Sequence, residues 1–126
     1  MNDKGDILVV DDSLANLKLL MGVLGRAGYR VRPAPNGRIA LNAVRTVPPD
    51  MVLLDVYMPE MNGYDVCLAL KEMPCMYNIP VIFVSAKREL ADRERAEQCG
   101  AVDFLLKPFC MDDVVIKVQH HLSRST

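Results

Sequence analysis

Five strand-like runs alternate with five helix-like segments along this 126-residue chain. Most of the runs are apolar without alternating polar positions, which is typical of strands that are buried on both faces. A strand-then-helix repeat with short connections predicts a parallel sheet covered by helices on both sides. We therefore expect one doubly wound α/β domain over residues 1–126, with a core at about 6–122. The strands are expected at 7–10, 30–32, 51–54, 81–84 and 104–106, and the helices begin near residues 14, 37, 63, 89 and 111.

The composition narrows the classes of function. A net charge of −1 gives no electrostatic argument for direct nucleic-acid or membrane binding. The polar N-terminus does not resemble a secretory signal, and no apolar stretch approaches membrane-spanning length. The four cysteines lack Cys-x-x-Cys spacing, which favours free thiols over a zinc site or disulfides. We expect a cytoplasmic protein.

Charged and polar residues follow the expected strands. Asp11 and Asp12 follow the first strand, Asp55 the third, Ser85 the fourth and Lys107 the fifth. Ligands of such sheets bind at the carboxyl ends of the strands, where these side chains should meet. Three adjacent carboxylates cannot all stay ionised without a cation. An oxygen-only ligand set favours a hard ion, so Mg²⁺ or Mn²⁺ is predicted here.

The same residues suggest phosphate chemistry. Lys107 offers a point charge for a phosphoryl group, and the Ser85 hydroxyl can donate a hydrogen bond to it. Asp55 would then be placed to attack phosphorus and carry the group as an acyl phosphate. Taken singly, each residue also has a plainer reading. The acidic pair suits a helix start, Lys107 a solvated turn and Ser85 a helix cap.

Two other functions compete with phosphate acceptance. The first is a Mg²⁺-dependent phosphohydrolase with Asp55 as nucleophile. Such enzymes commonly need a second acid two residues later, where this chain has Tyr57. The second is a flavin-binding module on the same kind of sheet, whose phosphate loop should offer free backbone donors. The Asp11-Asp12 pair would repel a phosphate, which argues against it.

Four separated motifs lie at the expected strand ends. They are Val10-Asp11-Asp12, Leu54-Asp55-Val56-Tyr57-Met58-Pro59 with Met61-Asn62-Gly63, Val84-Ser85-Ala86, and Leu106-Lys107-Pro108-Phe109. Together they resemble the receiver domain of two-component response regulators, and the resemblance extends from about residue 6 to 122, in the right order and strand context. It implies a flavodoxin-like (CheY-like) sheet of five parallel strands in the order 2-1-3-4-5.

The resemblance implies a role for each site residue. Asp55 matches the phospho-accepting aspartate. Asp12 and Asp55 match side-chain Mg²⁺ ligands, Asp11 matches an acid that holds the ion through water, and the backbone carbonyl of Tyr57 matches a further ligand. Lys107 matches the lysine that binds the phosphoryl group, and its bond to Pro108 is expected to be cis.

The resemblance also implies a signalling switch rather than an enzyme that turns over a metabolite. Ser85 matches the switch hydroxyl and Phe104 the switch aromatic, while Tyr57 and Lys87 are expected to tune the lifetime of the phosphate. The donor would be a histidine kinase or a histidine phosphotransfer protein. The fourth helix, fifth strand and fifth helix would present the output surface to an effector, and homodimers could form there. The chain would be free-standing or part of a longer regulator.

Overall fold

The computed structural model describes residues 4–86 and 90–124. In this part of the chain, five strands form one sheet in the order β2-β1-β3-β4-β5, and every neighbouring pair is parallel. The predicted fold class and strand order are therefore confirmed. The strands are β1 (Asp6–Val10), β2 (Arg30–Ala34), β3 (Met51–Asp55), β4 (Val81–Ser85) and β5 (Asp103–Leu106).

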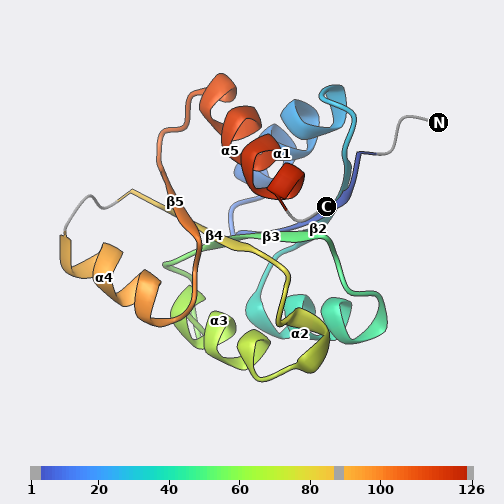
Figure 1. The fold of residues 1–126 in the computed structure, drawn as a ribbon. Coiled ribbons are helices and arrows are strands. Elements are labelled where there is room, and N and C mark those ends of the chain that lie inside the picture. The colour runs from blue at the N-terminus through green and yellow to red at the C-terminus, as the bar shows by residue number, and fades with distance from the viewer. Residues whose placement is uncertain (1–3, 87–89, 125–126) are drawn as a thin grey trace.

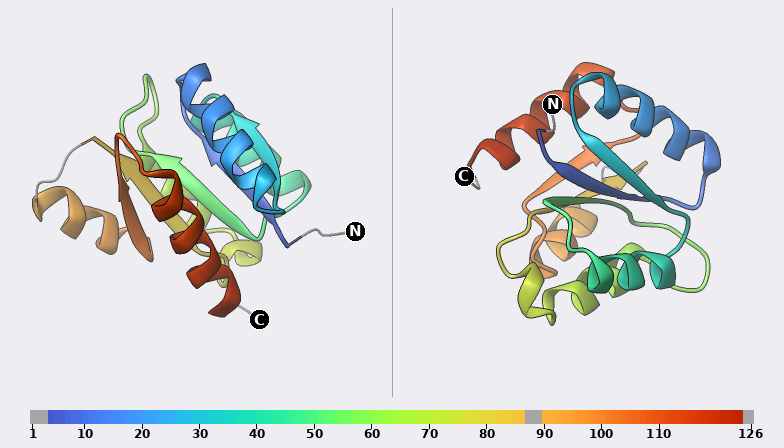
Figure 2. Two further views of the ribbon diagram at one scale, coloured as in Figure 1. Left: turned by 90° about the horizontal axis from the view of Figure 1, so that it is seen from above. Right: turned by 90° about the vertical axis from the view of Figure 1, so that its right-hand side faces the viewer.

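The helices lie on both faces of the sheet. Figure 1 shows α1 and α5 on one face and α2, α3 and α4 on the other, and Figure 2 shows the arrangement from two further sides. Residues 74–76 form an additional short 3-10 helix that begins at a proline. The α-helices are α1 (Leu14–Arg26), α2 (Gly37–Thr46), α3 (Gly63–Lys71), α4 (Leu90–Gln98) and α5 (Met111–Arg124). None of the described helices has both the length and the apolar character that crossing a bilayer requires.

Three helices begin with a side-chain cap just beyond the carboxyl ends of the strands. Ser13 Oγ accepts from the backbone N–H of Asn16 (3.3 Å), and Asn36 Oδ1 accepts from that of Ile39 (2.9 Å). Asn62 caps α3 in the same way. Each cap satisfies a backbone donor that the helix leaves unpaired and contributes about 1 kcal/mol. The loops at this edge are therefore tied to the helix starts.

The sheet separates two hydrophobic cores. Successive side chains of a strand point to opposite faces, so Leu8 and Val10 pack under α2 and α3, whereas Ile7 and Val9 pack under α1 and α5. All five residues of β3 are buried. This two-sided burial explains why the apolar runs of the sequence do not alternate.

Three side chains lie differently from the sequence prediction. The helical pattern predicts that Leu14 and Ile39 face the core, but they are 64% and 43% exposed. Leu14 opens α1 at the sheet edge, before the helix reaches the core. Leu41 instead joins the buried face of α2. For His121, the sequence predicts a surface position at a helix end, but the side chain is half-buried, with its Nε2 2.8 Å from Asp103 Oδ2. The polar character of Arg30–Arg32 predicts an edge strand, and β2 does lie at one edge of the sheet.

Candidate functional site

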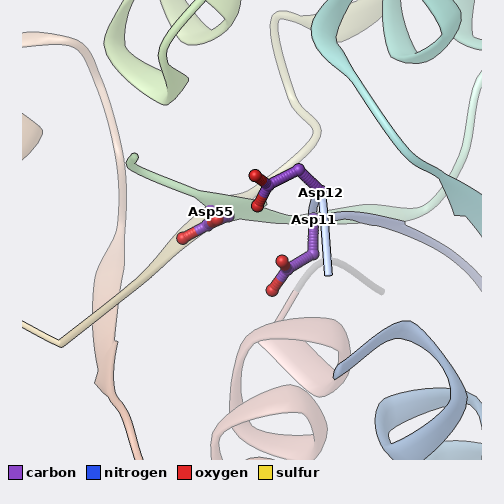
Figure 3. A group of neighbouring side chains, drawn as sticks. All are labelled: Asp11, Asp12 and Asp55. Atoms are coloured by element: carbon purple, nitrogen blue, oxygen red, sulfur yellow. The ribbon is translucent and has the colours of Figure 1, made fainter. Parts of the chain in front are cut away.

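Three carboxylates gather at the carboxyl edge of the sheet, as the sequence predicts. Val10 pairs with Leu54 in the parallel register, so the residues that follow them, Asp11 and Asp55, emerge side by side. One ligand atom from each of Asp11, Asp12 and Asp55 lies within 4.8 Å of the others (Figure 3). Asp11 and Asp55 are buried, whereas Asp12 is exposed to solvent.

Lys107, the residue that follows β5, contacts two of these acids. Its Nζ lies 3.1 Å from Asp11 Oδ2 and 3.2 Å from Asp55 Oδ1. The backbone N–H of Lys107 donates to Ser85 O at 2.8 Å, which ties the lysine to the end of β4. The bond from Lys107 to Pro108 is cis, as expected. One ammonium group therefore spans the two buried carboxylates, and Asp12 lies beside them without a described contact to it.

The protein groups leave excess negative charge at Asp55. Burial and, next, the Asp11 carboxylate raise the pKa of Asp55 to about 6, although Lys107 opposes the shift. Burial alone would lower the pKa of Lys107, but the Asp55 and Asp11 carboxylates outweigh it and raise that pKa. One lysine thus does not fully compensate these acids, and additional positive charge would stabilise an ionised Asp55.

The chemistry of this cluster fits a metal ion. Its ligand atoms are carboxylate oxygens, and one of the three acids is open to solvent, so an ion here could keep bound water. Hard divalent cations prefer this combination of oxygen ligands and water. The acidic cluster can therefore hold a metal ion.

The remaining predicted site residues surround the cluster at different depths. Asp55 pairs with Val84, which places the next residue, Ser85, at the end of the adjacent strand, and Ser85 is buried. Tyr57 lies two residues beyond Asp55 and is exposed. Lys87 lies outside the described residues. The structure thus brings Lys107 into contact with Asp11 and Asp55, places Asp12 within 4.8 Å of these acids, and puts Ser85 on the neighbouring strand.

Phe104 lies farther from the carboxylates, in β5 opposite Phe83. It is 8% exposed, and Arg93 of α4 has its Cζ 6.0 Å from the centre of the ring. Arg95 lies closer to another aromatic ring, 4.1 Å from the centre of Tyr64. The charged pattern of this helix predicts a solvated face, and both arginines are exposed, but the structure also places them over aromatic rings.

Two contacts near the site are not predicted by the sequence. Asn16 Nδ2 donates to Asp11 Oδ2 at 3.3 Å. Gly63 lies against the backbone of Asp55, where a Cβ atom would overlap the Asp55 carbonyl oxygen. The Asn62-Gly63 pair signals a helix start, but nothing in the sequence indicates how close this glycine comes to β3. The five-residue spacing from Asp11 to Asn16 carries no recognisable signal either.

Known proteins resemble this chain over nearly all of its length. Residues 7–119 match the family described as "Response regulator receiver domain". The response regulator PleD of Caulobacter vibrioides is 44% identical over 110 residues, covering 87% of this chain and 24% of that protein. A "probable cyclic di-GMP phosphodiesterase" of Vibrio cholerae is 39% identical over 116 residues, covering 92% of this chain and 26% of that protein.

The fold comparison agrees with the sequence comparison. The crystal structure of a putative response regulator from Chloroflexus aurantiacus superposes with a TM-score of 0.91 at 32% identity, covering 95% of this chain and 98% of that one. This chain spans about a quarter of the length of the two curated relatives. Because sequence and fold match over the same span, the chain belongs to the response regulator receiver domain family.

Proposed function

We propose that Asp55 accepts a phosphoryl group from a phosphohistidine on a histidine kinase or a histidine phosphotransfer protein. The observation that carries the proposal is the Lys107 ammonium shared between Asp11 and Asp55, at 3.1 and 3.2 Å. It supplies positive charge beside a buried carboxylate, where a transferred phosphoryl group needs it. Membership in the receiver family implies phosphorelay signalling and agrees with this role.

The transfer exchanges one phosphorus bond for another. An oxygen of Asp55 attacks phosphorus, a new P–O bond forms, and the P–N bond to the donor histidine breaks. The electron pair of that bond stays on the imidazole nitrogen, which can take a proton from solvent. Lys107 and the Ser85 hydroxyl would stabilise the phosphoryl oxygens, and the product is an acyl phosphate on Asp55.

Mg²⁺ or Mn²⁺ is the cation that the carboxylate cluster would hold. Asp11, Asp12, Asp55 and the backbone carbonyl of Tyr57 are its proposed protein ligands. When bound, the cation supplies positive charge that neutralises carboxylate and phosphoryl oxygens. The raised pKa of Asp55 supports this assignment, because a second cation would favour the ionised nucleophile.

The conformational change that follows phosphorylation would reach the surface through β4 and β5. We propose that Ser85 and Phe104 form the switch, and that α4, β5 and α5 present the changed surface to an effector or to a second copy of the chain. Exposed Tyr57, with Lys87, would tune the phosphate lifetime. This chain would be a cytoplasmic signalling domain, and any output enzyme activity would lie in a separate domain or partner.

Phosphorylation by a small donor tests the proposal directly. The protein is incubated with Mg²⁺ and acetyl phosphate, and intact mass spectrometry should find one added phosphoryl group. Asp55→Asn should abolish the adduct, because the amide is a poor nucleophile. Asp65→Asn, at an exposed position on α3, is the matched control and should keep it. An adduct that persists in Asp55→Asn, or a wild-type protein that stays unmodified, would contradict the proposal.

A further inference from the structure

The side chain of Asn16 contacts the acidic cluster from the first turn of α1. Its Nδ2 donates to Asp11 Oδ2 at 3.3 Å, while its backbone N–H donates to Ser13 Oγ at the same distance. Asparagine is a weaker helix former than alanine, so this position gives up some helix propensity. What the amide provides in exchange is a donor directed at the carboxylate.

Asp11 is held through both of its carboxylate oxygens. Oδ1 accepts from the backbone N–H of Ser13 at 2.9 Å. Oδ2 accepts from Asn16, and it is also the oxygen that lies 3.1 Å from Lys107 Nζ. A carboxylate fixed at two different oxygens cannot rotate freely about its side-chain bonds. The contact with Asn16 therefore fixes the oxygen that Asp11 presents to Lys107.

We infer that Asn16 is a positioning residue for the cation site. It orients Asp11, which is 1% exposed, so that the three acids stay close together before an ion binds. It has no described contact with Asp55 and acts through Asp11 alone. The inference rests on the proposed function, since it requires that the cluster binds a divalent cation. Hydrogen-bond partners of metal-binding carboxylates commonly control affinity in this way.

Mn²⁺ affinity of the unphosphorylated protein is the appropriate measurement, because it involves no phosphate chemistry. Free Mn²⁺ is followed by electron paramagnetic resonance during titration. Asn16→Ala should weaken Mn²⁺ binding about tenfold, the lower end of the effect expected for a partner of a ligating group. The melting temperature should stay the same or rise, since alanine keeps the backbone N–H that Ser13 caps and favours the helix.

Asn36→Ala is the matched control. It makes the same chemical change at the start of α2, where Asn36 caps the helix through Ile39 N–H. This variant should lower the melting temperature, yet its Mn²⁺ affinity should stay within about twofold of wild type, as expected for independent sites. Opposite effects of the two variants on stability and affinity separate a positioning role from general destabilisation.

The outcomes distinguish this inference from the function on which it rests. If Asn16→Ala binds Mn²⁺ as tightly as wild type, or if Asn36→Ala loses as much affinity, Asn16 does not position the site. If the wild-type protein binds no Mn²⁺, the proposed cation site itself is wrong and the inference fails with it. Only a loss of Mn²⁺ affinity in Asn16→Ala that Asn36→Ala does not share supports a positioning role for Asn16.

Discussion

Arg95 lies over the ring of Tyr64, with its Cζ 4.1 Å from the ring centre, and this contact ties α4 to α3. Tyr64 is in turn packed 5.2 Å from Phe83 of β4, measured between ring centres. Among residues 93–98 of α4, whose side-chain burial the structure describes, Ala96 alone is buried in the core. The position of α4 therefore depends on contacts of its charged side chains as well as on apolar burial.

Removing the Arg95 contact should loosen α4 selectively. Arg95→Ala is expected to lower the unfolding free energy by about 0.5–1 kcal/mol, the range for a cation–π pair near the surface. Amide hydrogen exchange should accelerate in α4 more than elsewhere. Arg38→Ala, at an exposed position on α2, is the control and should leave exchange in α4 unchanged. Equal exchange in both variants would show that the stacking does not hold the helix.

The raised pKa of Asp55 predicts a pH-dependent stability. The folded protein binds the Asp55 proton more tightly than the unfolded chain, with a pKa of about 6 against an ordinary value of 3.8 for an aspartate side chain. The stability that this carboxyl contributes is therefore fully present below the unfolded-chain pKa of 3.8, and it is lost as the pH rises through the folded-state pKa of about 6. In the absence of divalent metal, Asp55→Asn should stabilise the protein by about 3 kcal/mol at pH 7.5.

Urea unfolding in the presence of a chelator checks this prediction. The advantage of Asp55→Asn should shrink to a small fraction of this value at pH 4, where the wild-type carboxyl is protonated in the folded state and close to its pKa in the unfolded chain. Asp65→Asn provides the matched control at an exposed acid. A constant difference between Asp55→Asn and wild type across this pH range would mean that ionisation of Asp55 is not responsible.

Lys107→Met should separate cation binding from phosphoryl transfer. The ammonium contacts oxygens of Asp11 and Asp55, so its removal should tighten Mn²⁺ binding by reducing competing positive charge. Phosphorylation by acetyl phosphate should slow by about a hundredfold, because a preorganised charge is lost from the transition state. Lys117→Met is the control, since Lys117 pairs with Asp103 instead. Loss of both properties in Lys107→Met would indicate that the site had collapsed.

Gly63 should tolerate no side chain. A Cβ atom there would overlap the Asp55 carbonyl oxygen and lie 2.9 Å from Val56 Cα, and both are backbone atoms. Gly63→Ala should cost about 1–3 kcal/mol of unfolding free energy through overpacking. Gly22→Ala, in α1 with open space around it, should instead stabilise the protein by up to about 1 kcal/mol. Similar values from chemical denaturation would refute the close approach.

The four cysteine thiols should fall into two classes by their rate of reaction with a maleimide. Burial raises the pKa of Cys67 to about 11 and also raises that of Cys99, and both residues are buried. Cys75 and Cys110 are exposed. A maleimide should therefore label Cys75 and Cys110 quickly in the native protein, while Cys67 and Cys99 should react only after unfolding. Peptide mapping that finds native labelling at Cys67 would contradict this prediction.

The sequence predicts the features that depend on periodicity and on strand ends. Non-alternating runs such as that of β3 identify a sheet buried on both faces, and parallel topology then brings Asp11 and Asp55 together. The motifs around Asp55 and Lys107 add the order of the strands. None of this requires knowledge of side-chain rotamers, because the backbone topology alone determines which residues meet.

Contacts between side chains from different elements are harder to predict. The charge of Arg95 indicates a solvated helix face, and only the packing of α4 against α3 reveals that it covers Tyr64. The contact of His121 is equally hard to predict, because its partner Asp103 lies eighteen residues away in the sequence. The exposure of Leu14 depends on where α1 starts relative to the sheet edge, which a helical pattern does not specify. Such details follow from tertiary geometry rather than from local preference.

The separation of the interior by the sheet has a practical consequence for redesign. Side chains under α1 and α5 belong to one core, and those under α2, α3 and α4 belong to the other. Substitutions that change side-chain volume in one core and in the other should have nearly additive effects on the unfolding free energy, because the two cores share no side chains. The core beneath α1 and α5 can therefore be redesigned while the packing of the core beneath α2, α3 and α4 is left unchanged.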